Sequence, residues 1–274
     1  MSVSPVPSTA RHTRGRAARQ LSILAAAACM ATASAAGDAA AEMDPADRSA
    51  ADIVAFATAA AGGDAWRNAR TNVMRGHATL CRDGTPDSCV HADDYVMYRD
   101  YPRDLTDAHA GTGRFRLDAR ADGRVLFKAS FDGERSYNQD GPLPEDRDRE
   151  TQESNFGFSA IRFALEDGFS LKRMVDDTVD GHACHFVRVT DPDGGHTLFG
   201  IDRDSGAIRY VGWQTPRGWH ERLYDDFYVA DDSGFVQPGH VRLYYDGLKT
   251  GDIRWTEAEI DVALDDALFV LGTP

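Results

Sequence analysis

Apolar and polar residues alternate in short runs from about residue 70 to the end of the chain. Phe115 and Leu117 alternate with charged residues, and Ile253 and Trp255 do the same. Asp-Gly pairs, which favour the positive φ values of two-residue hairpin turns, separate many of these runs. Such pairs begin at Asp83, Asp122, Asp132, Asp167, Asp180, Asp193 and Asp246, among others. The pattern predicts a mainly β protein, an antiparallel meander with one solvent-facing side.

Before the predicted strands, apolar residues recur at the spacing that is typical of helices. Apolar residues predict a helix that begins at Asp44 or Ser49 and reaches about Ala61. Asp64 is then expected to cap a short second helix over 65–69. The two helices would lead directly into the first strand.

A charged segment, 141–153, interrupts the strand pattern and is expected to be a solvated loop. The residues after it are apolar at helical spacing, which predicts a short amphipathic helix over about 156–165 with Ser159 as a possible cap. Its apolar residues are Phe156, Phe158, Ile161, Phe163 and Leu165. A helix placed here could plug or cover the sheet.

Cys81 and Cys89 enclose a loop of turn-forming residues, so the loop is expected at the tip of a hairpin. Cysteines that flank a turn can face each other across two strands at bridging distance. We therefore expect a Cys81–Cys89 disulfide, with two free thiols as the alternative. Cys184 is expected to be unpaired and buried.

The N-terminus has the order of a secretory signal. Residues 1–20 carry four arginines and no acid, 21–28 are apolar, and Ala33-Ser34-Ala35 forms a small-residue cleavage site. The apolar run is too short to span a bilayer as a helix. The alternative is an ordinary alanine-rich helix.

Residues 1–35 are thus expected to be a signal peptide, 36–50 a flexible leader and 51–274 a single domain. Cleavage near Ala35 would release the chain into a Gram-negative periplasm. Cys29 leaves a second option, because Ala26-Ala27-Ala28 before it is a weak version of a lipoprotein box. Lipidation there would anchor the protein to a membrane instead.

The 274-residue chain has 42% hydrophobic residues, enough for a sizeable core, and a formal charge of −14. A negative charge of this size argues against nucleic acid as a partner, because phosphates require a basic face. It also argues against a polybasic contact with anionic lipid head groups.

Candidate chemistry is sparse. His182 and Cys184 would point to one face of a strand and His185 to the other, whereas tetrahedral zinc needs at least three converging ligands. Neighbouring aspartates on strands would face opposite ways, so we interpret the five Asp-Asp pairs as solvated surface. They lie at 93–94, 176–177, 225–226, 231–232 and 265–266. We expect no metal and no cofactor.

No G-x-S-x-G, H-E-x-x-H or glycine-rich phosphate loop is present in the sequence, so no enzyme is expected. A hydrolase with dispersed catalytic residues stays as a remote alternative. It would need a serine or a carboxylate pair beside His185, His196 or His220.

Aromatic residues gather in the C-terminal third of the chain. They are Trp213, Trp219, Tyr224, Phe227, Tyr228, Tyr244, Tyr245 and Trp255. A sheet core explains them, and so does an apolar cavity inside a curled sheet, which some of them would line.

The order of elements resembles the LolA/LolB-like lipoprotein-carrier superfamily, in an uncharacterised branch. The matching segments are 62–66 (GGDAW), 131–133 (FDG), 179–181 (VDG) with 185–189 (HFVRV), 201–208 (IDRDSGAI) and 264–269 (LDDALF). The resemblance implies one curved antiparallel sheet, an incomplete β-barrel of about eleven strands, with helices over its concave side. It also implies that the concavity holds acyl chains of lipoproteins or related lipids.

The leading hypothesis is therefore non-catalytic binding or transport of a lipid or lipoprotein acyl chain. The helix over 156–165 would be a movable lid, and Phe127, Trp213, Tyr245 and Trp255 would belong to the cavity wall. Envelope proteins are possible further partners, and a monomer is expected. The alternative is a structural or interaction module of the envelope with a filled core.

Overall fold

The computed structural model describes residues 48–101, 113–148 and 157–272, and residues 43–274 form one compact unit. The predicted signal peptide and most of the predicted leader lie outside the described residues. Of the helices in the described segments, none has the length and apolar character needed to cross a membrane.

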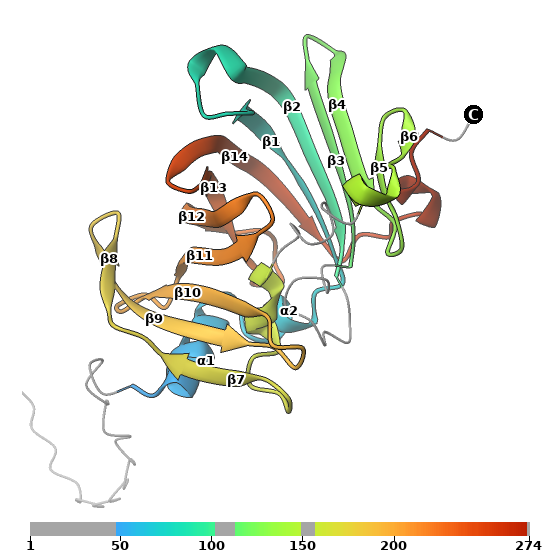
Figure 1. Cartoon of the computed structure of the whole chain (residues 1–274). Helices are drawn as coiled ribbons and strands as arrows, with labels where there is room; N and C mark the ends of the chain where they lie inside the picture. The colour runs from blue at the N-terminus through green and yellow to red at the C-terminus, as the bar shows by residue number, and fades with distance from the viewer. Residues whose placement is uncertain (1–47, 102–112, 149–156, 273–274) are drawn as a thin grey trace, which may run out of the picture. The chain divides into compact units, whose positions relative to one another are not determined.

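One antiparallel sheet of 14 strands dominates the described part of the chain (Figure 1). Its strands are β1 (Thr71–Cys81), β2 (Cys89–Asp100), β3 (Arg114–Ala121), β4 (Arg124–Phe131), β5 (Ser136–Asn138), β6 (Gly141–Pro142), β7 (Ser170–Arg173), β8 (Asp177–Val179), β9 (His182–Thr190), β10 (His196–Asp202), β11 (Ile208–Thr215), β12 (Gly218–Val229), β13 (Val236–Tyr245) and β14 (Leu248–Ile260). The predicted mainly β, antiparallel class is confirmed. The resemblance implied fewer strands, and β5, β6 and β8 are too short to show any alternation.

The sheet is an open meander whose two halves meet in the middle. The strand order is β6-β5-β4-β3-β2-β1-β14-β13-β12-β11-β10-β9-β7, with β8 also paired to β9. The pairing of β1 with β14 joins the two ends of the domain, with Val73 opposite Glu259. Because β6 and β7 lie at opposite edges, the sheet is not closed into a barrel.

Asp-Gly turns connect three of the hairpins, as predicted. Both residues have positive φ at Asp122-Gly123, Asp180-Gly181 and Asp246-Gly247. These pairs link β3 to β4, β8 to β9 and β13 to β14 with two-residue loops. At the other four of these seven pairs, and at Asp140-Gly141, only the glycine has positive φ.

Helix α1 (Ala50–Ala60) begins at Ser49, one of the two predicted starts. The Ser49 side chain accepts a hydrogen bond from the Asp52 amide at 3.2 Å, and the Asp52 carboxylate accepts one from the Ser49 amide. This capping box satisfies amides that have no partner within the helix. Ile53 and Val54 are fully buried, and α1 contacts β7 and β9 (Figure 1).

Helix α2 (Asp64–Asn68) corrects one prediction. Gly63, with φ +59, precedes it, and Asp64 is its first residue rather than its cap. A side chain at the Gly63 position would be strained in this left-handed conformation. Trp66 on α2 is buried.

The predicted amphipathic helix over 156–165 is instead a shorter 3₁₀ helix, η3 (Gly157–Arg162), followed by a turn. The turn residues Glu166, Asp167 and Gly168 oppose continuation of a helix. Ala160 and Ile161 are buried, and η3 contacts β10 and β11. This segment therefore belongs to the core.

The C-terminal segment covers the face of β3 and β4 that carries Arg116 and Ser130. The alternation pattern predicted that this face would be exposed to solvent. A 3₁₀ helix, η4 (Asp266–Phe269), buries Phe269 completely. The Ser130 hydroxyl donates to the Phe269 carbonyl at 2.7 Å, and Arg116 donates to the Leu268 carbonyl at 3.0 Å. Polar side chains on this face are thus buried with hydrogen-bond partners.

The Cys81–Cys89 disulfide is present, as predicted, and joins the ends of β1 and β2 around the 3₁₀ turn η2 (Pro86–Ser88). Cys184 is unpaired and buried, also as predicted.

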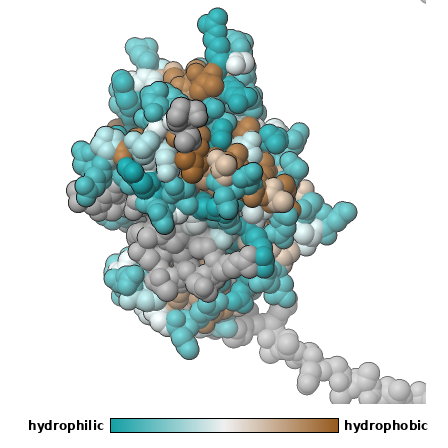
Figure 2. Space-filling model, turned by 90° about the vertical axis from the view of Figure 1, so that its right-hand side faces the viewer, coloured by the Kyte–Doolittle hydropathy of each residue, from teal (hydrophilic) through white to brown (hydrophobic). Residues whose placement is uncertain are grey.

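The face of the molecule drawn in Figure 2 is mainly hydrophilic, with hydrophobic residues gathered in its upper half.

Candidate functional site

An apolar cavity of about 710 Å³ lies against one face of the sheet. We call this face the inner face; it carries Tyr95, Leu117, Val211 and Val241. The end of α1, Trp66 of α2 and Arg162 of η3 also border the cavity. Its volume falls within the range of roughly 300–1,000 Å³ that small-molecule sites occupy.

Strand register brings the lining residues together from both halves of the sheet. Met97 pairs with Met74 on one side and with Leu117 on the other. In the second half, Val241 pairs with both Tyr224 and Ile253. Cross-strand partners point to the same face, so the register alone produces a continuous apolar wall.

Two aromatic rings stack over a glycine in this wall. Gly76 of β1 pairs with Tyr95 on β2 and with Trp255 on β14. The two rings lie with centroids 5.3 Å apart and planes inclined by 21°. Both residues are buried, and both line the cavity.

Four arginines border the same cavity: Arg99, Arg162, Arg222 and Arg209, the last of which is paired with Asp202. Arg99 is 2% exposed and Arg162 is 4% exposed. Burial lowers the pKa of Arg99 to about 10, and the charges of Arg222 and Arg162 act in the same direction. Burial also lowers the pKa of Arg162. The cavity therefore combines apolar walls with a local excess of positive charge.

Aromatic rings hold the Arg162 guanidinium. Its central carbon lies 4.0 Å from the Tyr101 ring centroid, 4.8 Å from that of Trp66 and 5.9 Å from that of Phe235. Arg99 approaches the same Tyr101 ring at 6.0 Å. Cation–π contact of this kind stabilises a cation that burial would otherwise destabilise.

A neutral histidine supports Arg222. The Nε of Arg222 donates to Nε2 of His220 at 3.1 Å, and His220 Nδ1 donates to the Tyr244 carbonyl at 2.9 Å. This arrangement requires an unprotonated Nε2. Burial, and secondarily the charge of Arg222, lowers the pKa of His220 to about 3, which is consistent with a ring that is neutral near pH 7.

The residues predicted for a lid or cavity wall lie in different places. Trp255 lines the cavity, and Trp213 and Tyr245 pack on either side of His220, outside the lining. Ile161 is buried, Phe127 and Phe163 pack against the core, and Leu165 is 51% exposed. Phe156 lies outside the described residues, as does the side chain of Phe158.

Sequence reasoning missed Tyr95, Met97 and Arg99, which face the cavity from β2. Their spacing of two places all three on one face of a strand, so an alternation search over 89–100 could have found them. Arg162 gave no such signal, because an arginine beside apolar residues is normally solvent-facing.

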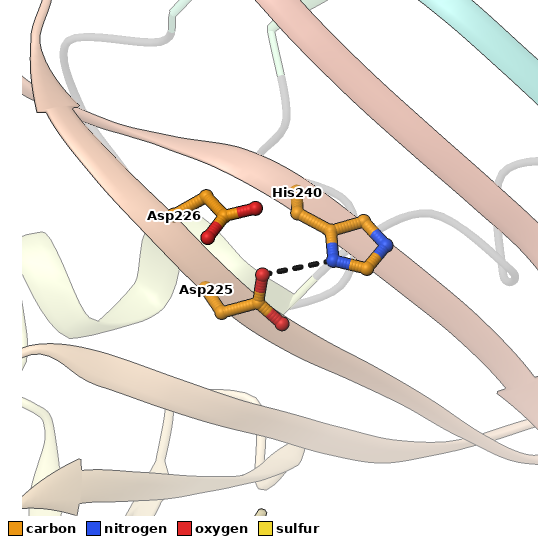
Figure 3. Close-up of side chains that lie close together, drawn as sticks. All are labelled: Asp225, Asp226 and His240. Carbon is orange, nitrogen blue, oxygen red and sulfur yellow. Dashed lines mark hydrogen bonds and ion pairs between the residues drawn. The ribbon is translucent and has the colours of Figure 1, made fainter.

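Asp225, Asp226 and His240 form a cluster whose candidate ligand atoms lie within 4.8 Å of one another (Figure 3). The alternation argument predicted that neighbouring aspartates diverge, and here that is wrong. Asp226 has φ +53, and a Cβ on the opposing Gly239 would lie 2.5 Å from the Asp226 carbonyl oxygen. The local backbone distortion turns both carboxylates toward His240.

Existing ion pairs account for this cluster. Asp225 accepts from His240 at 2.8 Å and from Arg242 at 2.8 Å, and Asp226 accepts from Arg254 at 2.5 Å. The other ring nitrogen of His240 lies 3.0 Å from Asp252. A metal ion would have to displace these partners, so the residues fit an ion-pair network better than a cation site.

The histidines that a hydrolase would use have other partners. His185 is buried and lies 2.9 Å from Asp176, whereas His196 is exposed and lies 3.0 Å from the Thr190 hydroxyl. His220 is engaged with Arg222 and Tyr244. None of these hydrogen bonds, within the described segments, pairs a histidine with a serine hydroxyl as a triad requires.

No protein-family model and no curated protein matches the chain. The structure is similar to that of the LolA superfamily protein NE2245 from Nitrosomonas europaea, with 10% identity, 81% of this chain and 98% of that chain covered, and a TM-score of 0.50. A putative outer membrane lipoprotein-sorting protein domain from Vibrio parahaemolyticus gives 10% identity, coverage of 80% and 94%, and a TM-score of 0.44. A DUF1329 family protein from Desulfovibrio piger gives 12% identity, coverage of 80% and 96%, and a TM-score of 0.45. The chain has the LolA-like fold.

Proposed function

We propose that this protein binds a lipid or a lipoprotein acyl chain in its inner-face cavity and carries it without catalysing a reaction. The observation that carries this proposal is a cavity of about 710 Å³ with a mainly apolar wall, built on a LolA-like fold. A structural module with a filled core would leave no such space.

Apolar burial would supply the affinity. Each methylene group moved from water into an apolar site contributes about 0.8 kcal/mol. Tyr95, Leu117 and Trp255 would contact the chain from the sheet, and Trp66 would contact it from α2. Arg162 of η3 borders the cavity, so a movement of η3 away from the sheet, which would expose its buried Ala160 and Ile161, would admit the ligand.

We place this function in the envelope of a Gram-negative bacterium, after export. Support comes from the basic and then apolar N-terminal sequence and from the Cys81–Cys89 disulfide, since such bonds persist in oxidising compartments. Cleavage near Ala35 would give a periplasmic protein, and lipidation of Cys29 would give an anchored one. The intact mass of the protein isolated from its host distinguishes the two products.

Native mass spectrometry of the purified mature protein tests the binding proposal. We expect a lipid-sized adduct that organic extraction removes and that returns when the extracted protein is refolded with lipid. A protein that never carries an adduct and takes up no lipid after extraction contradicts the proposal.

A further inference from the structure

The most informative feature of the cavity is its buried positive charge. Charged side chains are seldom fully buried, because the low-dielectric interior does not replace their hydration. Arg162 is 4% exposed, and its Nε and Nη2 atoms have no hydrogen-bond partner among the described residues. A guanidinium in this state is suited to an anionic partner that reaches it from the cavity.

The surroundings of Arg162 determine how such a partner would approach. Tyr101 and Trp66 lie against the guanidinium at 4.0 and 4.8 Å. At these distances both rings make cation–π contacts with the guanidinium. Ring contacts of this kind do not use the N–H donors, so the N–H bonds of Nε and Nη2 stay available for a planar or tetrahedral oxyanion.

The neighbouring charges strengthen this preference. Arg99 and Arg222 border the same cavity. The acidic lining residues Asp225 and Asp226 are already paired with Arg242 and Arg254. The potential at the Arg162 end is therefore positive, within a chain whose formal charge is −14.

We propose that the cavity selects amphiphiles with an anionic head group, a carboxylate or a phosphate, and that Arg162 binds the head group while Arg99 and Arg222 stabilise its charge. This inference rests on the proposed function and narrows it. The acyl chain would lie along the apolar wall of Tyr95, Leu117 and Trp255. A neutral lipid of the same chain length would fill the wall and leave Arg162 without a counter-charge.

Two cavity tryptophans provide a direct assay, because bromine atoms quench indole fluorescence on contact. Trp66 and Trp255 line the cavity, out of four tryptophans in the chain. The extracted protein is titrated with 9,10-dibromostearate and with 9,10-dibromostearyl alcohol. A second pair, dibrominated phosphatidylglycerol and dibrominated diacylglycerol, tests phosphate in place of carboxylate.

We expect at least one anionic probe to bind roughly tenfold more tightly than its neutral partner, the ratio expected from a charge-assisted hydrogen bond. The pair that shows the preference identifies the head-group chemistry. Equal binding within both pairs overturns this inference and leaves the proposed function intact. Absence of quenching by all four probes contradicts the proposed function as well.

Arg162→Gln should abolish most of the preference while retaining binding of the neutral probe. Arg75→Gln is the matched control, because Arg75 is an exposed strand residue 3.8 Å from Glu259. A preference that survives intact in a folded Arg162→Gln protein contradicts the role of Arg162. If that variant fails to fold, the probe comparison on the unmodified protein still decides the inference.

Discussion

Tyr95 and Trp255 stack across Gly76, although 160 positions separate them in sequence. The rings come from β2 and β14, the two neighbours of β1, and their centroids are 5.3 Å apart. A glycine between them leaves the space over the central strand that the two rings occupy. The stack therefore joins the two halves of the sheet at the wall of the cavity.

Gly76→Ala should destabilise the protein. A Cβ at this position would lie 1.8 Å from the Arg254 carbonyl oxygen, which belongs to the paired backbone. Overpacking of this kind costs about 1–3 kcal/mol, and a backbone neighbour cannot rotate away. Urea unfolding should show the loss, whereas His77→Ala, at the exposed next residue, should leave the midpoint unchanged. An unchanged midpoint for Gly76→Ala would mean that β1 and β14 are farther apart than described.

Local sequence was sufficient for the features that short segments determine. The capping box at Ser49, the Asp-Gly hairpins and the disulfide each depend on residues a few positions apart. The cavity depends on register between distant strands, such as Ile253 opposite both Ala78 and Val241. No local pattern encodes that register. Trp255 was identified for its aromatic character, and alternation alone places Tyr95 on one face of a strand without showing which strands lie beside it.

Buried charge was the second feature, after strand register, that could not be predicted from the sequence. A guanidinium is expected at the surface, and the rings that surround Arg162 come from α2, from the end of β2 and from the segment before β13. Asp226 was misjudged for a related reason. Its positive φ overrides the alternation on which the argument about neighbouring aspartates rested.

His220 should make stability depend on pH. Its folded pKa of about 3 lies below its ordinary value of 6.5, so the unfolded chain binds the proton first as the pH falls. Stability is therefore lost between pH values of about 6.5 and 3, by at most about 1.4 kcal/mol per pH unit from this residue. Denaturant unfolding between pH 7 and 5 should show a smaller slope for His220→Gln than for the unmodified protein. Equal slopes would mean that His220 is already protonated or solvated in the folded state.

Reduction of the Cys81–Cys89 disulfide should lower stability. The bond closes a loop with a sequence separation of 8, and the chain-entropy model gives roughly 2.5 kcal/mol for a loop of that size. Dithiothreitol should reduce the thermal midpoint of the unmodified protein and have no effect on a Cys81→Ala/Cys89→Ala double variant. A reductant effect that persists in the double variant would assign the loss to another group.

Phe269→Ala should unfold the C-terminal segment that covers β3 and β4 on the side opposite the inner face. The ring is fully buried, and its backbone carbonyl accepts the hydrogen bond from Ser130. Large-to-small changes at buried aromatic residues cost about 3–5 kcal/mol. Leu248→Ala, at a residue that is 59% exposed, is the control. Hydrogen exchange should show that the amides of β3 and β4 lose protection in this variant. An even rise in exchange over the whole sheet would contradict the idea that the C-terminal segment protects these strands locally.

Leu117→Trp should weaken lipid binding by filling the cavity. Leu117 lies on the inner face of β3 and lines the space that the acyl chain would occupy. A larger ring there would displace at least two methylene groups, at about 0.8 kcal/mol each, which corresponds to roughly a tenfold loss of affinity. Val125→Trp adds the same ring on β4 at a residue that is 47% exposed, and it should bind like the unmodified protein. Titration of both variants with one acyl probe compares them directly. Equal affinities in two folded variants would place the acyl chain outside this cavity, whereas a loss confined to Leu117→Trp would locate it against the inner face of β3.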